Sequence, residues 1–591
     1  MHLIRACGLT AMGLILAGRA AIADDAPAPL TDHQKAVHVL NRLGFGPRPG
    51  DVERVEQMGV DAYIHQQLHP ETIDDAKADA ATARFETQSM SSARLMDAMN
   101  TDIKNYLQMQ RTAGNMQEMK LRYGVDAGDD SKPAKPVEKP KSASEKLKEA
   151  TGHEATRAVG ELVQVKLIRC AISERQLHEV LVDFWSNHFN IDVKKSSCQA
   201  LKVADDREAI RPHVLGKFRD LLGASAHSPA MLHYLDNNEN SVARERSGLE
   251  KMAANIYINY KLGIKSTGLI SDREGPNENY GRELLELHTL GVEGGYTQKD
   301  VQEVARCFSG WTDSFFSGKF NFESNRHDNG QKVVLGHTLA AGGGIKDGEQ
   351  VLDILASHPA TARFISRKLC QRFVADEPPA ELVDHITEVF TKTDGDLRAV
   401  VEAIVTSPEF FSPTAYRAKI KSPLEFAVSA LRATGGTFVE PAVPAFAKLA
   451  SLKEGANALG YGEDGKTTHK SFNRYIRDMG EPLFGCSPPT GYSEVSRKWV
   501  SPGALIDRLN FALALTDEKV IGVKVDLAQP AVSDPHAAVD QLAQSLLHDP
   551  VSPGTEKVIE QSAMSGEGQA RTIDTAKLTA LILGSPEFQR R

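Results

Sequence analysis

Two glutamates three positions apart, Glu283 and Glu286, are the residues best placed by type and spacing for acid–base chemistry. Paired carboxyl groups suit glycoside cleavage, because one can donate a proton to the leaving oxygen while the other accepts one from water. They also suit a divalent cation, which prefers oxygen ligands. Asn279 lies four residues before Glu283 and therefore shares its face of a helix. We interpret the two glutamates as candidate catalytic residues and Asn279 as a candidate binding residue.

The same glutamates also have a purely structural interpretation. The helix expected over residues 279–289 carries leucines around most of its circumference, which is typical of a buried helix. Buried charges need partners. Arg282 stands four residues from both Glu278 and Glu286 and can pair along the helix, whereas Glu283 has no such partner. The segment therefore forms either an ion-pair network that fixes the helix register or a functional site in which Arg282 takes part in binding.

Three further clusters supply candidate site residues. His188 lies in the polar and aromatic run 183–190 and could be a ligand or a general base, although such a histidine is more often a hydrogen-bonded core residue. Asp236 begins the oxygen-rich run 236–240, which could hold a hard cation or sugar hydroxyls. That run lacks EF-hand spacing, and turn chemistry alone explains it. His327 is the third candidate. We assign His188 a catalytic role and the other two a binding role.

The sequence lacks the motifs of several standard enzyme classes. It contains no Walker A loop, no GxSxG, no GxGxxG after an expected strand and no HExxH. These absences argue against nucleotide hydrolysis, the usual serine esterase chemistry and dinucleotide redox. The net charge of −9 and the isoelectric point of about 6.1 give no sign of a nucleic-acid partner.

The first 23 residues predict a signal peptide. His2 and Arg5 precede the apolar run Ala6–Gly18, and Ala21-Ile22-Ala23 is a small-x-small cleavage pattern. Cleavage is expected after Ala23, which makes the protein periplasmic or secreted. No later stretch approaches the roughly 18 consecutive apolar residues of a spanning helix, so no membrane span is expected in the mature chain.

Cysteine usage does not indicate a metal ribbon or a redox motif. The odd number of cysteines after cleavage leaves at least one free or paired between chains, and no two form CxxC. Cys170 and Cys198 could be joined in an oxidising compartment. Burial as small apolar side chains is the favoured interpretation for Cys307 and Cys370. The pattern among all five stays open: Cys170, Cys198, Cys307, Cys370 and Cys486.

The length and the composition predict several regions. A chain of 591 residues is too long for one ordinary core and indicates roughly two to four packed units. We divide it into an N-terminal helical region (31–123), an insertion (124–150), a central helical core with a hairpin (151–440) and a C-terminal helical region (441–591). The insertion repeats lysine and proline with few apolar residues, so it is expected to be disordered.

Apolar periodicity predicts a mainly α fold, a multi-helix assembly with one small β-hairpin near residues 315–335. One long helix is expected from Glu154 through Trp185, because its apolar residues form a wide helical face. In the hairpin, Phe320 and Phe322 alternate with polar residues, and Asp328-Asn329-Gly330 supplies turn chemistry. Shorter helices are expected at 33–43, 51–58, 60–68, 206–223, 229–235, 279–289, 298–308, 349–356, 359–374, 379–391 and 395–406.

Longer motifs make the sequence similar to a known family. The most specific runs from Asn277 through Asp300 and includes Arg282-Glu283-Leu284-Leu285-Glu286-Leu287-His288-Thr289-Leu290-Gly291-Val292. Others are Arg42-Leu43-Gly44-Phe45-Gly46-Pro47, Phe184-Trp185-Ser186-Asn187-His188-Phe189, Ser309-Gly310-Trp311, His327-Asp328, His358-Pro359-Ala360-Thr361-Ala362-Arg363-Phe364 and Trp499-Val500-Ser501. Over most of the mature chain the sequence resembles the bacterial family catalogued as domain of unknown function 1800.

The resemblance implies an exported protein but no activity and no catalytic residue. Relatives are often encoded beside a second exported family with a phosphatase- or sulfatase-like fold, which implies an exported partner protein. Trp311, in one of the shared motifs, joins the candidate binding residues. The lysine- and proline-rich insertion departs from the usual family pattern as a surface feature.

Together these features favour an exported enzyme, a hydrolase or lyase that acts on an extracytoplasmic polymer or glycan through paired carboxylates. A divalent metal is left open as a cofactor. The alternative is a non-catalytic binding or assembly protein that serves an exported partner. The two readings differ in what Glu283→Gln should do: the change should destabilise a scaffold helix but leave an active-site helix as stable as before or more so.

Overall fold

The computed structural model describes residues 28–99, 153–195, 197–245, 247–249, 251–252, 273–314, 317–439, 470–532, 534–565 and 572–591. The predicted signal peptide and the predicted insertion at 124–150 lie outside these residues.

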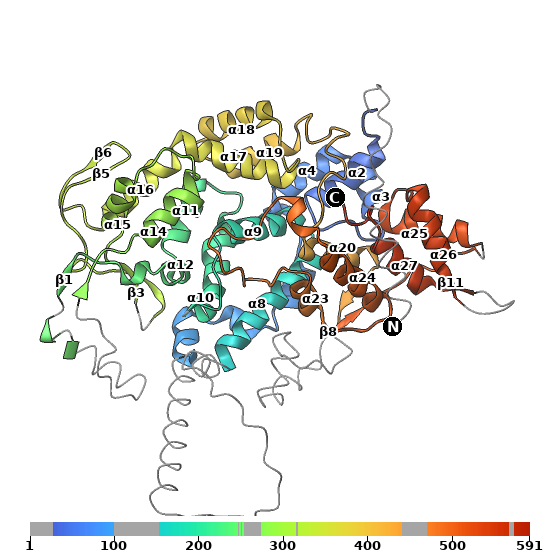
Figure 1. Cartoon of the computed structure of the whole chain (residues 1–591), viewed down its shortest axis with the longest axis horizontal. Helices are drawn as coiled ribbons and strands as arrows, with labels where there is room; N and C mark the ends of the chain where they lie inside the picture. Colours follow the sequence, from blue (N-terminus) through green and yellow to red (C-terminus); the bar gives the residue numbers. More distant parts are fainter. Residues whose placement is uncertain are drawn as a thin grey trace, which may run out of the picture.

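Helices account for most of the described chain, so the prediction of a mainly α fold is confirmed (Figure 1). None of them combines the length and the apolar content needed to cross a lipid bilayer. The longer helices are α2 (Asp32–Arg42), α3 (Asp51–Met58), α4 (Val60–Leu68), α5 (Ala76–Thr82), α8 (His153–Ile172), α9 (Gln176–His188), α10 (Cys198–Ala204), α11 (Phe218–Ala226), α12 (Pro229–Tyr234), α14 (Asn279–Glu283), α15 (Gln298–Cys307), α16 (Ile345–Ala356), α17 (Pro359–Phe373), α18 (Ala380–Lys392), α19 (Leu397–Val405), α20 (Pro423–Ala433), α23 (Phe472–Asp478), α24 (Pro502–Thr516), α25 (Pro535–Leu547), α26 (Pro553–Ala563) and α27 (Thr575–Leu583).

The strands form small two-stranded pairs. They are β1 (Arg244–Glu245) with β2 (Arg273–Glu274), β3 (Trp311–Ser314) with β4 (Lys319–Phe322), β5 (Lys332–Val334) with β6 (His337–Leu339), β7 (Thr437–Phe438) with β10 (Val523–Lys524), β8 (Lys470–Ser471) with β9 (Val520–Ile521), and β11 (Met564–Ser565) with β12 (Thr572–Ile573). All pairs are antiparallel except β8 with β9.

The region predicted as one hairpin contains parts of two hairpins, and its Asp328–Gly330 turn is used differently. The Asp328 side chain accepts a hydrogen bond from Gly330 N at 2.8 Å and another from Arg306 Nε at 2.8 Å. These bonds fix a loop between β4 and β5. The turn between β5 and β6 is instead made by Leu335 and Gly336, whose φ angles of 48° and 81° suit a tight hairpin turn.

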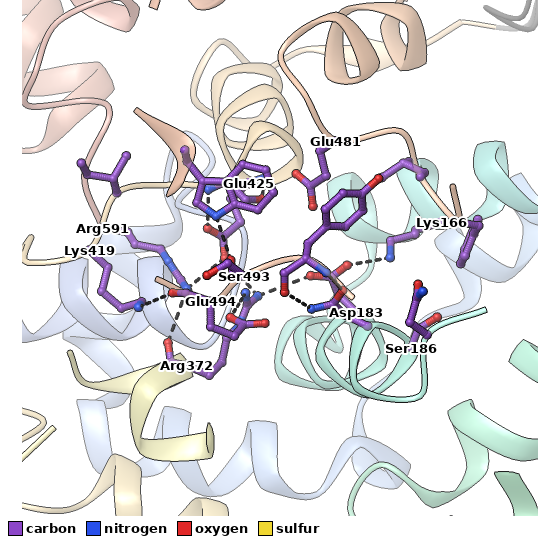
Figure 2. A pocket seen from close by; sticks show the side chains of 18 of the residues that line it. Lys166, Asp183, Ser186, Arg372, Lys419, Glu425, Glu481, Ser493, Glu494 and Arg591 are labelled. Atoms are coloured by element: carbon purple, nitrogen blue, oxygen red, sulfur yellow. Dashed lines mark hydrogen bonds and ion pairs between the residues drawn. The ribbon is translucent and has the colours of Figure 1, made fainter. Parts of the chain in front are cut away.

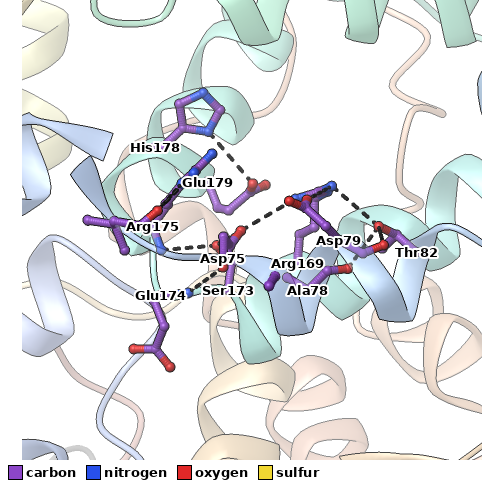
Figure 3. A network of polar contacts seen from close by, with 12 residues as sticks. Asp75, Ala78, Asp79, Thr82, Arg169, Ser173, Glu174, Arg175, His178 and Glu179 are labelled. Atoms are coloured by element: carbon purple, nitrogen blue, oxygen red, sulfur yellow. Dashed lines mark hydrogen bonds and ion pairs between the residues drawn. The ribbon is translucent and has the colours of Figure 1, made fainter. Parts of the chain in front are cut away.

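The long helix predicted from Glu154 to Trp185 is interrupted, and Figure 3 shows the polar network at the corner. The helix α8 ends at Ile172, and α9 begins at Gln176. Asp75 accepts hydrogen bonds from Ser173 Oγ and Glu174 N, both at 2.9 Å. The prediction of one helix was therefore wrong, because a carboxylate about a hundred residues away satisfies the groups at the break.

The helix α20 lies in the core of the assembly, since each of its eleven residues is buried. The turn after α2, which contains Gly46, packs directly on α20. Gly46 has a φ of 91°, and a Cβ there would lie 2.7 Å from Ser429 Oγ. The Arg432 side chain donates to Gly46 O at 2.6 Å. The glycine in this motif is thus required both by the backbone angle and by the close approach of α20.

The first and the last helices of the described chain lie at one side of the molecule. Figure 1 shows α2, α3 and α4 beside α25, α26 and α27, while α11, α14, α15 and α16 form the opposite side. His33 Nε2, on α2, lies 2.9 Å from His548 O, just after α25. All five described cysteines are free and buried, so Cys170 and Cys198 are not joined, and the burial expected for Cys307 and Cys370 is confirmed.

Candidate functional site

A charged cavity lies where distant parts of the chain meet (Figure 2). Its lining comes from α8, α9, α17, the start of α20, the loop 481–499 and Arg591. The cavity offers about 50 Å³ to the centres of water-sized molecules. One water needs roughly 10–15 Å³, so the cavity has room for a few waters or for a small part of a larger molecule.

Two arginines and two glutamates form an ion-pair cluster on one side of the cavity. Arg372 lies 3.0 Å from Glu425 and 3.3 Å from Glu494, and Arg591 lies 3.0 Å from Glu425. Burial by itself raises the pKa of Glu425, but Arg591 and Arg372 outweigh it and lower that pKa to about 2. This side of the cavity therefore keeps fixed charges of both signs at all ordinary pH values.

The opposite side combines a paired and an unpaired acid. Lys166 Nζ lies 2.6 Å from Asp183 Oδ1. Glu481 has no ion-pair partner among the described residues, and its Oε2 accepts a hydrogen bond from Leu424 N at 2.8 Å. Burial and the neighbouring Asp183 raise the pKa of Glu481 to about 8. At neutral pH the cavity thus holds a protonated carboxyl group beside a carboxylate, the two forms that acid–base catalysis needs.

Two side-chain amides, one on α9 and one just after it, hold the loop 481–499 over the cavity. Asn187 Nδ2 donates to Tyr492 O at 2.8 Å, and Tyr492 N donates to Asn187 Oδ1 at 2.7 Å. Asn190 Nδ2 donates to Cys486 O and to Pro488 O, both at 2.9 Å. Because these amides satisfy backbone groups that no helix or strand would satisfy, the loop has a defined course.

Aromatic and hydroxyl groups complete the lining. Tyr492 and Trp499 are half-buried, with ring centroids 5.8 Å apart, and Trp499 Nε1 donates to Ser493 O at 3.1 Å. Ser186 Oγ is buried and has no hydrogen-bond partner among the described residues. A bound molecule could therefore meet both an apolar ring face and an unused hydroxyl group.

Glu283 and Glu286 lie outside this cavity. Glu283 ends α14, and Glu286 belongs to the π-helical turn Leu284–Thr289 that follows; both are half-buried. Burial and the charge of Glu286 raise the pKa of Glu283. The Tyr296 hydroxyl donates to Glu286 Oε2 at 2.7 Å. The two carboxyl groups are thus near enough to influence each other, as a paired-carboxylate site requires.

The neighbours of these glutamates on α14 are tied to other groups. Arg282 Nη2 lies 3.5 Å from Glu278 and donates to Gln298 Oε1 at 2.9 Å. Asn279 is exposed, and its amide donates to Leu235 O at 3.2 Å. The predicted pairing of Arg282 is therefore confirmed for Glu278. Among the described residues, neither Glu283 nor Glu286 has an arginine at ion-pair distance.

His188 is buried and belongs to a separate cluster. Its Nε2 lies 3.1 Å from His288 O, and its Nδ1 lies 2.9 Å from Lys368 Nζ. Burial and Lys368 hold the pKa of His188 well below its usual value, and burial lowers that of Lys368 to about 8. His188 does not line the charged cavity, whereas Asn187 and Asn190 do.

The remaining sequence candidates lie elsewhere. Asp236 pairs with Lys195 at 2.8 Å. His327 is buried, with Nε2 3.0 Å from Asp347 Oδ2, and Trp311 is also buried. No hydrogen bond or ion pair between described residues connects Glu283 or Glu286 to these groups or to His188. The sequence candidates therefore form several local clusters.

One described group of three side chains has ligand atoms close enough together for a metal ion: His536, Asp540 and Glu556. It lies on α25 and α26, and two of its three members are exposed. His536 Nδ1 is 2.6 Å from Glu556. None of the residues predicted to form the site belongs to this group.

The residues that line the cavity differ in how easily the sequence alone could identify them. The run 183–190 can be recognised by its many polar and aromatic residues, and within it the sequence pointed to His188. The cavity is instead lined by Asp183, Ser186, Asn187 and Asn190. Ser422 and Glu425 form a capping box at the start of α20, so a local motif explains both. Nothing local marks Glu481, because its pKa depends on a carboxylate almost three hundred residues away.

The fold and the site define a mainly α-helical protein with a cavity built from buried ion pairs. The chain belongs to the family described as "Protein of unknown function (DUF1800)", whose model matches residues 38–590. Comparison with curated proteins and with solved structures gave no match.

Proposed function

We propose that the protein is an exported enzyme, a hydrolase or lyase that cleaves an extracytoplasmic polymer or glycan, with Glu481 and Asp183 as its acid–base pair. The observation that carries this proposal is one cavity containing an acid without a cationic partner beside an acid held by Lys166. Two carboxyl groups in different environments can act as a proton donor and a proton acceptor.

For hydrolysis of a glycosidic bond, Glu481 donates its proton to the leaving oxygen as the carbon–oxygen bond breaks. A water molecule forms the new carbon–oxygen bond, and its proton passes to Asp183. Proton transfer from Asp183 to Glu481 through solvent restores the starting state. Lys166 and Arg372, whose nitrogens lie 2.6 Å and 3.6 Å from Asp183, place two positive charges beside its carboxyl group.

Glu283 and Glu286 are a second candidate pair for the same chemistry. The raised pKa of Glu283 and the hydrogen bond from Tyr296 to Glu286 give these two acids different environments as well. A divalent cation remains an alternative there, because half-buried carboxyl groups without arginine partners can act as oxygen ligands.

The two pairs are tested by screening the purified protein against polysaccharides and assaying variants on whatever substrate it cleaves. Glu481→Gln and Asp183→Asn should each lower kcat by roughly 100-fold or more, since they remove a proton donor or acceptor. Glu388→Gln, an exposed change on α18, is the matched control. Loss of activity only in Glu283→Gln and Glu286→Gln would move the centre to the second pair, and wild-type activity in all four would refute both.

The alternative proposal is a non-catalytic binding or assembly protein for an exported partner. It predicts that Glu283→Gln destabilises the protein, because the glutamate then serves the helix packing. The enzyme proposal predicts an unchanged or higher melting temperature, since burial and Glu286 both disfavour the ionised form of Glu283. Export itself is tested by sequencing the N-terminus of the protein recovered outside the cytoplasm, where cleavage after Ala23 is expected.

A further inference from the structure

Buried cations and acids form ion pairs throughout the cavity. Lys166 is paired with Asp183, and Lys419 lies 2.6 Å from Asp376. The described residues in and directly behind the wall also include four buried arginines and three acidic side chains. The arginines are Arg42, Arg372, Arg508 and Arg591, and the acids are Glu425, Glu481 and Glu494.

The four arginines stay positively charged, because the guanidinium group does not lose its proton in proteins. Arg42 and Arg508 have no acidic partner at ion-pair distance among the described residues. They donate instead to neutral oxygens, Arg42 to Ala415 O and Arg508 to Gln589 Oε1.

Several donor groups in the lining are also unused. Arg372 Nε, Arg591 Nε and Arg591 Nη1 are buried and donate no hydrogen bond to a described residue. The exposed fractions of the two arginines are 4% and 3%, so water outside the protein does not solvate them. Buried donors without acceptors are rare in folded proteins, and charged ones are the most costly.

We infer that the cavity is an oxyanion-binding site in which Arg372 and Arg591 hold a carboxylate group. An oxyanion offers several acceptor atoms to the unused guanidinium donors. Ser186 Oγ supplies a further donor in the same lining. If the proposed function is correct, this carboxylate belongs to the substrate. The substrate is then an acidic glycan with uronic acid units.

Binding is measured by calorimetry on the full chain at constant ionic strength, with glucuronate as the probe and glucose as the neutral control. Glucuronate should bind and glucose should not. Arg591→Gln should weaken glucuronate binding by roughly 10-fold or more, because charge-assisted hydrogen bonds are lost. Arg363→Gln, an exposed change on α17, should leave binding unchanged.

Inorganic sulfate and phosphate distinguish the kind of oxyanion. If they bind and glucuronate does not, the carboxylate assignment is overturned. If neither they nor glucuronate bind the wild-type protein better than glucose, the oxyanion site itself is refuted. Should Arg591→Gln fail to fold, Arg591→Lys keeps the charge but loses the fork of donors and should still weaken binding. These measurements report binding and not catalysis. They therefore test the oxyanion site even if the protein cleaves no glycan.

Discussion

Replacement of Glu481 by glutamine should remove a pH dependence of stability that this single carboxyl group creates. Burial and Asp183 raise its pKa from 4.5 to about 8 in the folded protein. Between these values the folded state holds a proton that the unfolded chain releases. The stabilisation is therefore complete below pH 4.5, decreases as the pH rises and is lost above about pH 8.

The size of the effect follows from the width of this window. Each unit of pKa difference corresponds to about 1.36 kcal/mol, so wild-type stability should fall by about 5 kcal/mol relative to Glu481→Gln. An unfolding entropy of about 2 cal/mol/K per residue gives a chain of this length about 1.2 kcal/mol/K. The difference in melting temperature between the two proteins should therefore change by about 4 °C across the window.

The assay is a series of thermal unfolding curves from pH 4.5 to pH 8.5 for the wild type, Glu481→Gln and Glu388→Gln. The exposed control should follow the wild type at every pH. If the curves of wild type and Glu481→Gln run parallel, Glu481 titrates normally, and the proton donor assigned to the cavity does not exist.

Two further changes test packing contacts, one beside Trp311 and one at the loop that covers the cavity. Gly348→Ala would place a Cβ 2.4 Å from the ring of Trp311, so it should destabilise the protein by about 1–3 kcal/mol in denaturant unfolding. Gly503→Ala is the control, because its Cβ would meet no atom within 4 Å. This change should have little effect on stability or increase it slightly. Equal stability of the two alanine variants would contradict the contact. Asn187→Asp removes the amide group that donates to the loop 481–499, so it should lower the free energy of unfolding by about 1–3 kcal/mol. Amide hydrogen exchange in that loop should become faster. Unchanged exchange would show that the loop does not depend on this hydrogen bond.

The sequence was sufficient for helices defined by local rules. The second and third helices were predicted within their observed bounds, Asp51–Met58 and Val60–Leu68, because glycines and apolar spacing mark their ends. The helix expected at 359–374 is observed as α17, Pro359–Phe373, and begins with a proline, which suits the first helical turn. Such signals are contained within a few residues and need no knowledge of the rest of the chain.

Features that depend on distant contacts were not predictable in this way. The break after α8 depends on Asp75, which satisfies Ser173 and Glu174 from another helix region. Glu481 resembles any polar loop residue until α9 brings Asp183 beside it. The face assigned to Glu283 and Glu286 assumed a regular α-helix, but the chain changes to a π-helical turn at Leu284. The polar and aromatic residues of the run 183–190 pointed to His188, while the cavity is lined by its neighbours Asn187 and Asn190.

The bond between Asn187 and Tyr492 joins residues 305 positions apart. On a ribosome the α9 wall emerges long before the loop that closes the cavity, so a nascent chain carries only half of it. If the chain crosses a membrane unfolded, the cavity is first completed on the far side. An activity that degrades polymers would then be absent from the compartment in which the protein is made.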